Sequence, residues 1–207
     1  ENSLLKRQGK DHIHIAAPEM RRTSNYLSNH KKVIVYIALF MRHLNTNGFC
    51  SMDQPYPLRN EFLCTMRIKV VDSYIMEDIP AGIRRRIDIL GAGEILGPKL
   101  NGIILPGGAD ALLTRKDGSL TPDVRLVART DDDAMIFIQY RGVRHGNPET
   151  MQRIAAGEQV SPNDYYLRNA PFFETGSKKY DWLNHILSIG VGRREPDSAV
   201  YDVYQIL

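Results

Sequence analysis

The feature that most constrains the fold is the punctuation of the sequence from Pro57 onward. Short apolar or β-branched runs recur about every 8–15 residues, and Gly, Pro or Asp separates each run from the next. This spacing, without an alternation of strands and helices, indicates an antiparallel sandwich or barrel. Several runs carry polar residues on both faces, which favours a barrel with a partly polar interior that can hold one small ligand. We therefore predict an all-β, antiparallel β-barrel for residues 57–207.

Two of these runs show strand alternation most clearly. Asp123–Thr130 places its arginines on one side and its small apolar residues on the other, and Met135–Arg141 places Ile136, Ile138 and Tyr140 on one side. The other expected strands are Phe62–Asp72, Ile83–Leu90, Gly102–Leu105, Leu112–Arg115, Tyr165–Asn169, His185–Val191 and Ala199–Leu207. We expect the glycines between positions 91 and 97 to form a long turn.

One short helix is expected in this otherwise all-β domain. Asn147 can cap its first turn, Pro148 suits that turn, and Gly157 suits its exit. The helical body would be Glu149–Ala156.

The first 56 residues differ from the rest in charge and patterning. They hold 8 basic and 4 acidic residues, whereas residues 57–207 hold 19 basic and 20 acidic residues, within a total of 27 Lys and Arg against 24 Asp and Glu. A near-neutral body has no electrostatic footprint for nucleic acid. Residues 1–30 are polar and aperiodic, so residues 1–56 are predicted to be a poorly structured N-terminal extension.

The apolar run Val33–Met41 is the one part of this extension that could be buried. Its length fits a signal-peptide core, but it lies about thirty residues in and no small-residue cleavage site follows it. We prefer a buried strand or short helix there, and keep secretion as the alternative. Cys50 and Cys64 are too few for a disulfide framework, which favours a reducing, cytoplasmic location. No apolar run approaches membrane-spanning length, so no membrane partner is expected.

The sequence argues against a metal or a nucleotide cofactor. The segment Gly91–Gly97 has the wrong third glycine spacing for a dinucleotide fingerprint, and Pro98 follows it. His12 and His14 could share one strand face, but no third His or Cys ligand is apparent. We expect no cofactor and no metal site.

Three groups of polar residues could carry chemistry, and each also has a structural explanation. Asp110 directly follows two glycines, yet it could simply accept turn amide hydrogen bonds. Asp123 and Arg125 share a strand face, where a structural ion pair is the alternative. Arg168 and Glu174 lie near one predicted loop among aromatic residues, and Glu174 could instead pair with either arginine.

The order of these motifs resembles the domain of unknown function 3237 family, also described as uncharacterised protein family 0311. The resemblance covers about residues 57–207. Its motifs are Gly97-Pro98, Leu105–Asp110, Asp117-Gly118, Asp123-Val-Arg125, Thr130–Asp132, Tyr140–Arg144, Tyr165–Arg168, Phe173–Gly176 and Tyr180–Asn184.

The resemblance implies a compact antiparallel β-barrel, and it implies little about activity. Some fungal members look like accessory enzymes of natural-product pathways, that is, of secondary metabolism. The chain departs from the family pattern at three positions. Ala111 stands where Trp is frequent, Asp133 where Gly is usual, and Leu167 where Phe is usual. Loss of an aromatic residue beside Asp110 is expected to reshape the cavity.

The leading hypothesis is a cofactor-free isomerase, cyclase or lyase that acts on a small apolar molecule inside the barrel. General acids and bases in a dry cavity suffice for such reactions. Asp110 would be the acid or base, Tyr140 or Tyr166 would donate to an oxyanion, and Glu174 is the reserve acid. The residues expected to bind the substrate are Arg125, Arg168, Tyr166 and Trp182.

The alternative is a barrel that binds a small ligand without changing it, and a homodimer is left open. An enzyme should place a carboxylate and a hydrogen-bond donor together on one cavity. A carrier should show an apolar cup with polar groups only at its mouth.

Overall fold

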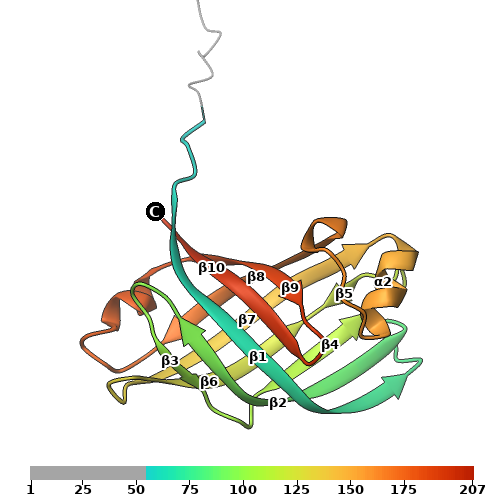
Figure 1. The fold of residues 1–207 in the computed structure, drawn as a ribbon, viewed down its shortest axis with the longest axis horizontal. Helices are drawn as coiled ribbons and strands as arrows, with labels where there is room; N and C mark the ends of the chain where they lie inside the picture. Colours follow the sequence, from blue (N-terminus) through green and yellow to red (C-terminus); the bar gives the residue numbers. More distant parts are fainter. Residues whose placement is uncertain (1–54) are drawn as a thin grey trace, which may run out of the picture. The chain divides into compact units, whose positions relative to one another are not determined.

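The computed structural model describes residues 55–207, which form an antiparallel β-barrel and confirm the predicted fold class (Figure 1). Its strands are β1 (Asn60–Glu77), β2 (Arg84–Leu96), β3 (Gly102–Ile104), β4 (Ala109–Thr114), β5 (Leu120–Thr121), β6 (Asp123–Thr130), β7 (Met135–Gly146), β8 (Tyr165–Glu174), β9 (Ser188–Arg194) and β10 (Ser198–Ile206). One α-helix, α2 (Pro148–Ala155), and two 3₁₀ turns, η1 (Pro162–Asp164) and η2 (Asp181–His185), complete this part of the chain.

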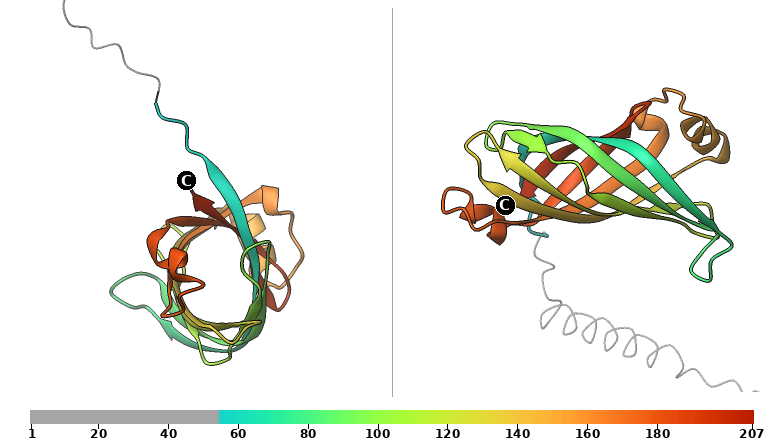
Figure 2. Two further views of the ribbon diagram at one scale, coloured as in Figure 1. Left: turned by 90° about the vertical axis from the view of Figure 1, so that its left-hand side faces the viewer. Right: turned by 90° about the horizontal axis from the view of Figure 1, so that it is seen from below.

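The sheet closes because its first strand has two partners. β1 pairs with β10 on one side and with β2 on the other, and β6 and β7 continue the ring between β2 and β8. The short strands β3 and β4 both bridge β2 and β6. Seen along its axis, the wall is a closed ring (Figure 2). Closure removes the open sheet edges that would otherwise need protection.

Strand alternation places apolar side chains inside the ring, as the sequence predicts for β6 and β7. Val124, Leu126, Ile136 and Ile138 are all at most 2% exposed. Each β-strand sends alternate residues to opposite faces, so their neighbours point outward. The inward row on β7 then changes from Ile136 and Ile138 to Tyr140 and Arg144. The barrel interior is therefore apolar toward the β6–β7 turn and polar toward the end where β7 leads into α2.

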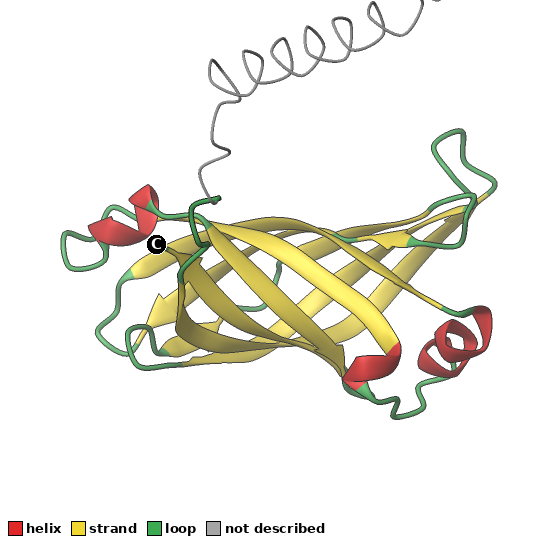
Figure 3. Ribbon diagram, turned by 90° about the horizontal axis from the view of Figure 1, so that it is seen from above, coloured by secondary structure: helices red, strands yellow, loops and turns green. Residues whose placement is uncertain are grey.

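The helices lie at the ends of the barrel (Figure 3). Helix α2 follows β7 and begins as predicted, because the Asn147 side chain accepts a hydrogen bond from the Thr150 N–H at 2.8 Å. Gly157, at φ 81°, follows its last turn. No helix in residues 55–207 is long and apolar enough to cross a membrane.

The prediction of a long turn between positions 91 and 97 is partly wrong. Gly91 and Gly93 lie inside β2, which runs on to Leu96. A Cβ at Gly91 would approach Val71 Cγ1 of β1 to 2.5 Å, and one at Gly93 would meet the Arg67 carbonyl oxygen. The register of β1 against β2 also shifts twice between Ile68 and Asp72. Glycine is needed here for close strand approach at bulges rather than for a turn.

Several predictions lie outside the described residues. These are the polar segment 1–30 with His12 and His14, the apolar run Val33–Met41, and Cys50. The domain boundary near Pro57 stays a prediction.

Candidate functional site

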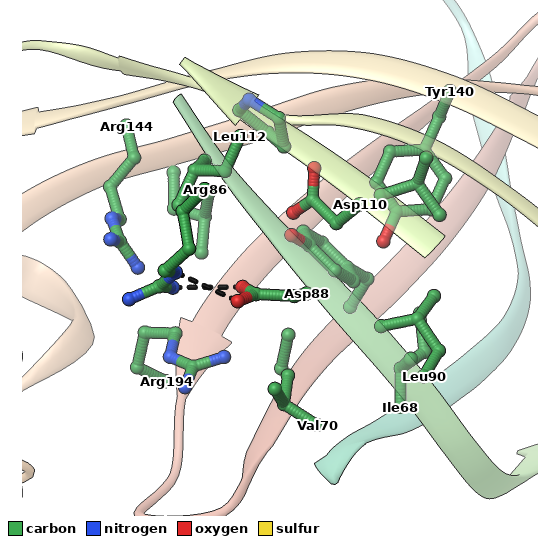
Figure 4. A pocket seen from close by; sticks show the side chains of 15 residues that line it. Ile68, Val70, Arg86, Asp88, Leu90, Asp110, Leu112, Tyr140, Arg144 and Arg194 are labelled. Atoms are coloured by element: carbon green, nitrogen blue, oxygen red, sulfur yellow. Dashed lines mark hydrogen bonds and ion pairs between the residues drawn. The ribbon is translucent and has the colours of Figure 1, made fainter. Parts of the chain in front are cut away.

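A small cavity with a volume of about 30 Å³ lies inside the polar end of the barrel. Strands from around the whole ring contribute to its wall, so residues far apart in the sequence meet there (Figure 4). The residues lining it are Ile68, Val70, Arg86, Asp88, Leu90, Asp110, Leu112, Pro122, Val124, Tyr140, Arg144, Leu167, Arg194, Ala199 and Tyr201.

Two carboxylates lie next to each other in the wall of this cavity. Asp88 on β2 and Asp110 on β4 are direct cross-strand partners. Arg86 pairs with Asp88 through both carboxylate oxygens, at 2.7 and 2.8 Å, and the Ser73 hydroxyl donates to Asp88 at 2.6 Å. Among the described residues, 55–207, Asp110 instead accepts one hydrogen bond, from the Asp123 backbone N–H at 2.9 Å. Asp88 is therefore held in a salt bridge, while Asp110 keeps oxygen lone pairs free for a ligand.

The environment of Asp110 suits proton transfer near neutral pH. Burial, and then the nearby Asp88 carboxylate, raise the pKa of Asp110 from 3.8 to about 6. The hydrogen bond from the Asp123 N–H and the charges of Arg144 and Arg86 oppose this rise. Burial disfavours the charged form of a carboxyl group, and a second carboxylate disfavours it further.

Two tyrosines stand beside Asp110. The rings of Tyr140 and Tyr201 pack edge to face, with their centroids 5.4 Å apart. Burial raises the pKa of Tyr201 to about 12, and burial followed by Tyr201 and Asp110 raises the pKa of Tyr140 well above its usual value. Both phenols therefore stay protonated near neutral pH and can donate hydrogen bonds.

Three arginines lie at the other side of the cavity. Figure 4 shows the guanidinium groups of Arg86, Arg144 and Arg194 gathered opposite Asp110 and Tyr140. Arg86 pairs with Asp88, and its side chain is 34% exposed, so the cavity reaches solvent at this side. Burial, followed by the charge of Arg194, lowers the pKa of Arg144 to about 10. These groups make this part of the cavity electropositive.

Of the predicted catalytic residues, the structure brings Asp110 and Tyr140 together and leaves Glu174 apart. Glu174 is exposed on β8, beside Phe172 and Gln139 on the outside of the wall. No ion pair joins Glu174 to Arg168 or Arg125 within residues 55–207. Glu174 cannot act on a molecule inside the barrel from this position.

The predicted binding residues also lie away from the cavity. Arg125 points outward from β6 and pairs with Asp123 at 3.0 Å. Tyr166 is 44% exposed on β8, stacks on the His145 ring, and has the Arg168 guanidinium 5.0 Å from its ring centroid. Trp182 lies in η2 and packs against the apolar core. We expected these groups to share one cavity with Asp110, and the structure does not bring them together there.

Five polar cavity residues were missed: Asp88, Arg86, Arg144, Arg194 and Tyr201. Ile83, which directly precedes β2, is 44% exposed, whereas Asp88 within β2 is only 3% exposed, so the charged face of this strand points inward. The polar residues at alternate positions of β2 were the one available signal. Strand alternation also corrects the expectation for Ala111. Its neighbours Asp110 and Leu112 face the cavity, so Ala111 faces away from it. Leu167 does line it.

The described residues give no support to a metal site. Residues 55–207 contain no group of three or more His, Cys, Asp or Glu side chains placed to bind a metal ion. Cys64 is buried within the core, and burial raises the pKa of its thiol to about 12, so it is a poor nucleophile and ligand. The absence of a cofactor stays a prediction.

Comparison with known sequences matches this barrel to one protein family. The family model described as "Protein of unknown function (DUF3237)" matches residues 58–206. A UPF0311 protein of Rhodopseudomonas palustris is 36% identical over 150 residues, which cover 72% of this chain and 97% of the relative. A protein of Penicillium herquei named "Hydroalkoxylation enzyme phnH" is 29% identical over 138 residues, covering 66% of this chain and 76% of the relative.

Solved structures share the fold. A protein of unknown function from Rhodopseudomonas palustris has a TM-score of 0.70 at 31% identity, covering 74% of this chain and all of its own. A β-barrel-like protein from Acinetobacter baumannii has a TM-score of 0.65 at 34% identity, covering 75% of this chain and all of its own. An enzyme from Penicillium herquei has a TM-score of 0.56 at 24% identity, covering 75% of this chain and 98% of its own, which shows a common fold alone.

Proposed function

The chain belongs to the DUF3237 family, and we propose that its barrel is a cofactor-free enzyme that closes a ring by adding a hydroxyl group across a carbon–carbon double bond. The reaction is an isomerisation, in keeping with the predicted cyclase chemistry. The observation that carries the proposal is Asp110, a largely buried carboxyl group that faces the cavity beside the phenol of Tyr140. The name of the Penicillium herquei relative, a hydroalkoxylation enzyme, supports the same reaction class.

In the proposed step, ionised Asp110 takes the proton from a substrate hydroxyl. The oxygen bonds to the β-carbon of a double bond conjugated with a carbonyl group, and the π electrons move to the carbonyl oxygen as an enolate. Asp110, now neutral, returns the proton to the α-carbon, so that no atom is gained or lost. A base with a pKa of about 6 is well matched to this work near neutral pH.

Tyr140 would stabilise the enolate oxygen. Its phenol stays protonated because burial raises its pKa, and it lines the same cavity as Asp110. A fixed donor in a cavity shielded from water stabilises developing negative charge more strongly than water does. Because the cavity measures only about 30 Å³, its lining side chains would move apart to admit the substrate, and apolar neighbours such as Val124 and Leu112 would then hold its hydrocarbon part.

The test uses 2′-hydroxychalcone, which carries both a phenol and a conjugated double bond. The purified 207-residue protein should speed its closure to flavanone and produce one enantiomer in excess. Asp110→Asn should lower kcat by about 10²–10⁴-fold, as expected for loss of a general base. With wild-type protein, kcat should fall as the pH drops below about 6, because Asp110 becomes protonated.

Asp131→Asn provides the matched control, since Asp131 is an exposed aspartate in the turn after β6. It should react like wild type. A racemic product would show that the ring does not close inside the cavity. An Asp110→Asn protein that remains folded and fully active would exclude Asp110 as the base. If the chalcone binds and is recovered unchanged, the barrel is a ligand-binding protein, the alternative considered from the sequence.

A further inference from the structure

The electropositive side of the cavity carries more arginine side chains than nearby carboxylates can pair with. Arg86 is the one cavity arginine with a carboxylate partner in the described chain, since it pairs with Asp88. Arg144 and Arg194 form no ion pair with any residue from 55 to 207. Figure 4 shows both guanidinium groups near Arg86, with no dashed contact to either of them.

Of these two arginines, Arg144 has the more clearly unpaired guanidinium group. Its Nε is buried from solvent and has no hydrogen-bond partner within the described residues. Leaving a buried charged donor unpaired is costly, and a second cation close by adds repulsion. Such an arrangement is retained where a ligand supplies the missing acceptor, because guanidinium groups form paired, charge-assisted hydrogen bonds with planar oxygen anions.

The position of these arginines suits one part of a bound molecule. Asp110 and Tyr140 lie on one side of the cavity, and the arginines lie opposite them (Figure 4). Apolar side chains, among them Val70 and Leu167, line the space together with these groups. A molecule that spans the cavity would place its reacting carbon at Asp110 and an anionic end at the arginines.

We propose that Arg144 and Arg194 form an anion subsite, so that the substrate is an amphipathic molecule with an anionic oxygen group, either a carboxylate or an ionised enol or phenol. This inference rests on the proposed function for the identity of the reacting end. It refines the expected apolar substrate by giving it a charged end.

Binding can be measured without turnover, by ligand-observed NMR on the 207-residue protein. Two pairs of probes separate the two anion types: benzoate against neutral benzamide, and 4-nitrophenolate against neutral 4-nitroanisole. We expect at least one anion to bind clearly more tightly than its neutral counterpart, and the pair that does so identifies the group. Arg144→Gln should weaken that anion about tenfold or more, as should Arg194→Gln.

Arg141→Gln is the matched control, because Arg141 lies on the same strand as Arg144 but is 75% exposed and pairs with Asp123 on the outside. It should bind like wild type. Circular dichroism establishes that each variant is folded, and Arg194→Gln serves as the test if Arg144→Gln does not fold. Equal binding of the anions and their neutral counterparts would overturn the proposal, as would folded arginine variants that bind normally.

The Asp110→Asn protein separates this inference from the proposed reaction. It should bind the preferred anion at least as tightly as wild type does, since it removes a nearby negative charge. Anion binding that depends on Arg144, without any ring closure of the chalcone, would contradict only the proposed reaction. Asp110-dependent ring closure without any preference for anions would contradict only the subsite.

Discussion

At the scale of single residues, two aspartates on neighbouring strands are placed in different electrostatic environments. Asp88 is neutralised by Arg86 and bonded by Ser73, whereas Asp110 receives one backbone hydrogen bond. Two like charges directly opposite each other on a sheet are unfavourable. Pairing one of them and raising the pKa of the other relieves that conflict, and it leaves a carboxyl group that can exchange a proton near neutral pH.

The raised pKa of Asp110 predicts a pH-dependent stability difference. Its folded-state pKa, about 6, lies above the unfolded value of 3.8, so the wild-type protein loses stability as the pH rises from about 4 to about 6. Asp110→Asn removes this penalty and can still accept the Asp123 N–H. We expect the variant to be more stable than wild type at pH 8, by at most about 3 kcal/mol, and nearly equal to it at pH 4.

Urea unfolding at both pH values measures this difference. The charged and titratable groups facing Asp110 in the cavity are common to both proteins, so their own titrations largely cancel. These groups are Arg86, Asp88, Tyr140, Arg144, Arg194 and Tyr201. A variant that is less stable than wild type at pH 8 would show that ionised Asp110 is instead a structural partner.

At the scale of secondary-structure elements, glycines in β9 make room for the cavity wall. A Cβ at Gly192 would lie 2.5 Å from Leu167 Cγ and 2.6 Å from Tyr201 Cε1, and both side chains line the cavity. Gly190 similarly leaves room for the Asn169 side chain of β8. The close packing of β8, β9 and β10 at this end therefore depends on the missing side chains of one strand.

Gly192→Ala tests this dependence. The added methyl group must displace Leu167 or Tyr201, and we expect a loss of about 1–3 kcal/mol in the free energy of unfolding. Gly176→Ala is the control, because a Cβ there meets nothing within 4 Å and its φ is not in the left-handed region. Chemical denaturation compares the two. Equal stability of both variants with wild type would mean that the wall can shift at no cost.

At the scale of the whole molecule, closure brings residues from every part of the barrel sequence to one cavity. The apolar end supplies the core that holds the ring together, and the polar end holds the charges. Unpaired buried charges destabilise a fold, so the ring must derive its stability from the apolar end. The charged cavity can exist because the rest of the barrel is closed and well packed.

The predicted boundary near Pro57 can be tested on the same scale. Limited proteolysis with trypsin should cleave within the N-terminal segment, as far as Arg42, and leave a folded barrel with unchanged circular dichroism. Related proteins support this expectation, because almost their entire length aligns with the barrel part of this chain. A remainder that unfolds after cleavage would move the boundary and make Val33–Met41 part of the core.

Local sequence signals predicted much of the fold. The alternation in β6 and β7, the Asn147 cap of α2 and the turn residues act within a few positions, so they can be interpreted without the rest of the chain. The same alternation placed Tyr140 with two buried isoleucines, and the glycines before Asp110 drew attention to it. These two cavity residues were within reach of sequence reasoning.

Arg125 and Glu174, in contrast, show why residue type alone was insufficient. Both are charged residues in motifs of the family pattern, and both lie on the outer wall, where an exposed charge costs little. Arg144 and Asp88 carry the same charges and point inward. Only the direction of the side chain distinguishes them, and in a strand that direction depends on which face the closed sheet turns toward its axis.

The sequence by itself therefore determined most of the strands, the helix caps and the all-β, antiparallel class, because these depend on short-range periodicity and turn chemistry. It misplaced the bounds of β2 (Arg84–Leu96) and of β9 (Ser188–Arg194). The tertiary structure decided that the charged face of β2 points inward, that Asp88 stands opposite Asp110, and that Arg144 and Arg194 share one cavity. Those outcomes depend on strand register and ring closure, which join residues more than a hundred positions apart. Burial and the field of such distant neighbours then set the protonation of the site, and no local pattern encodes them.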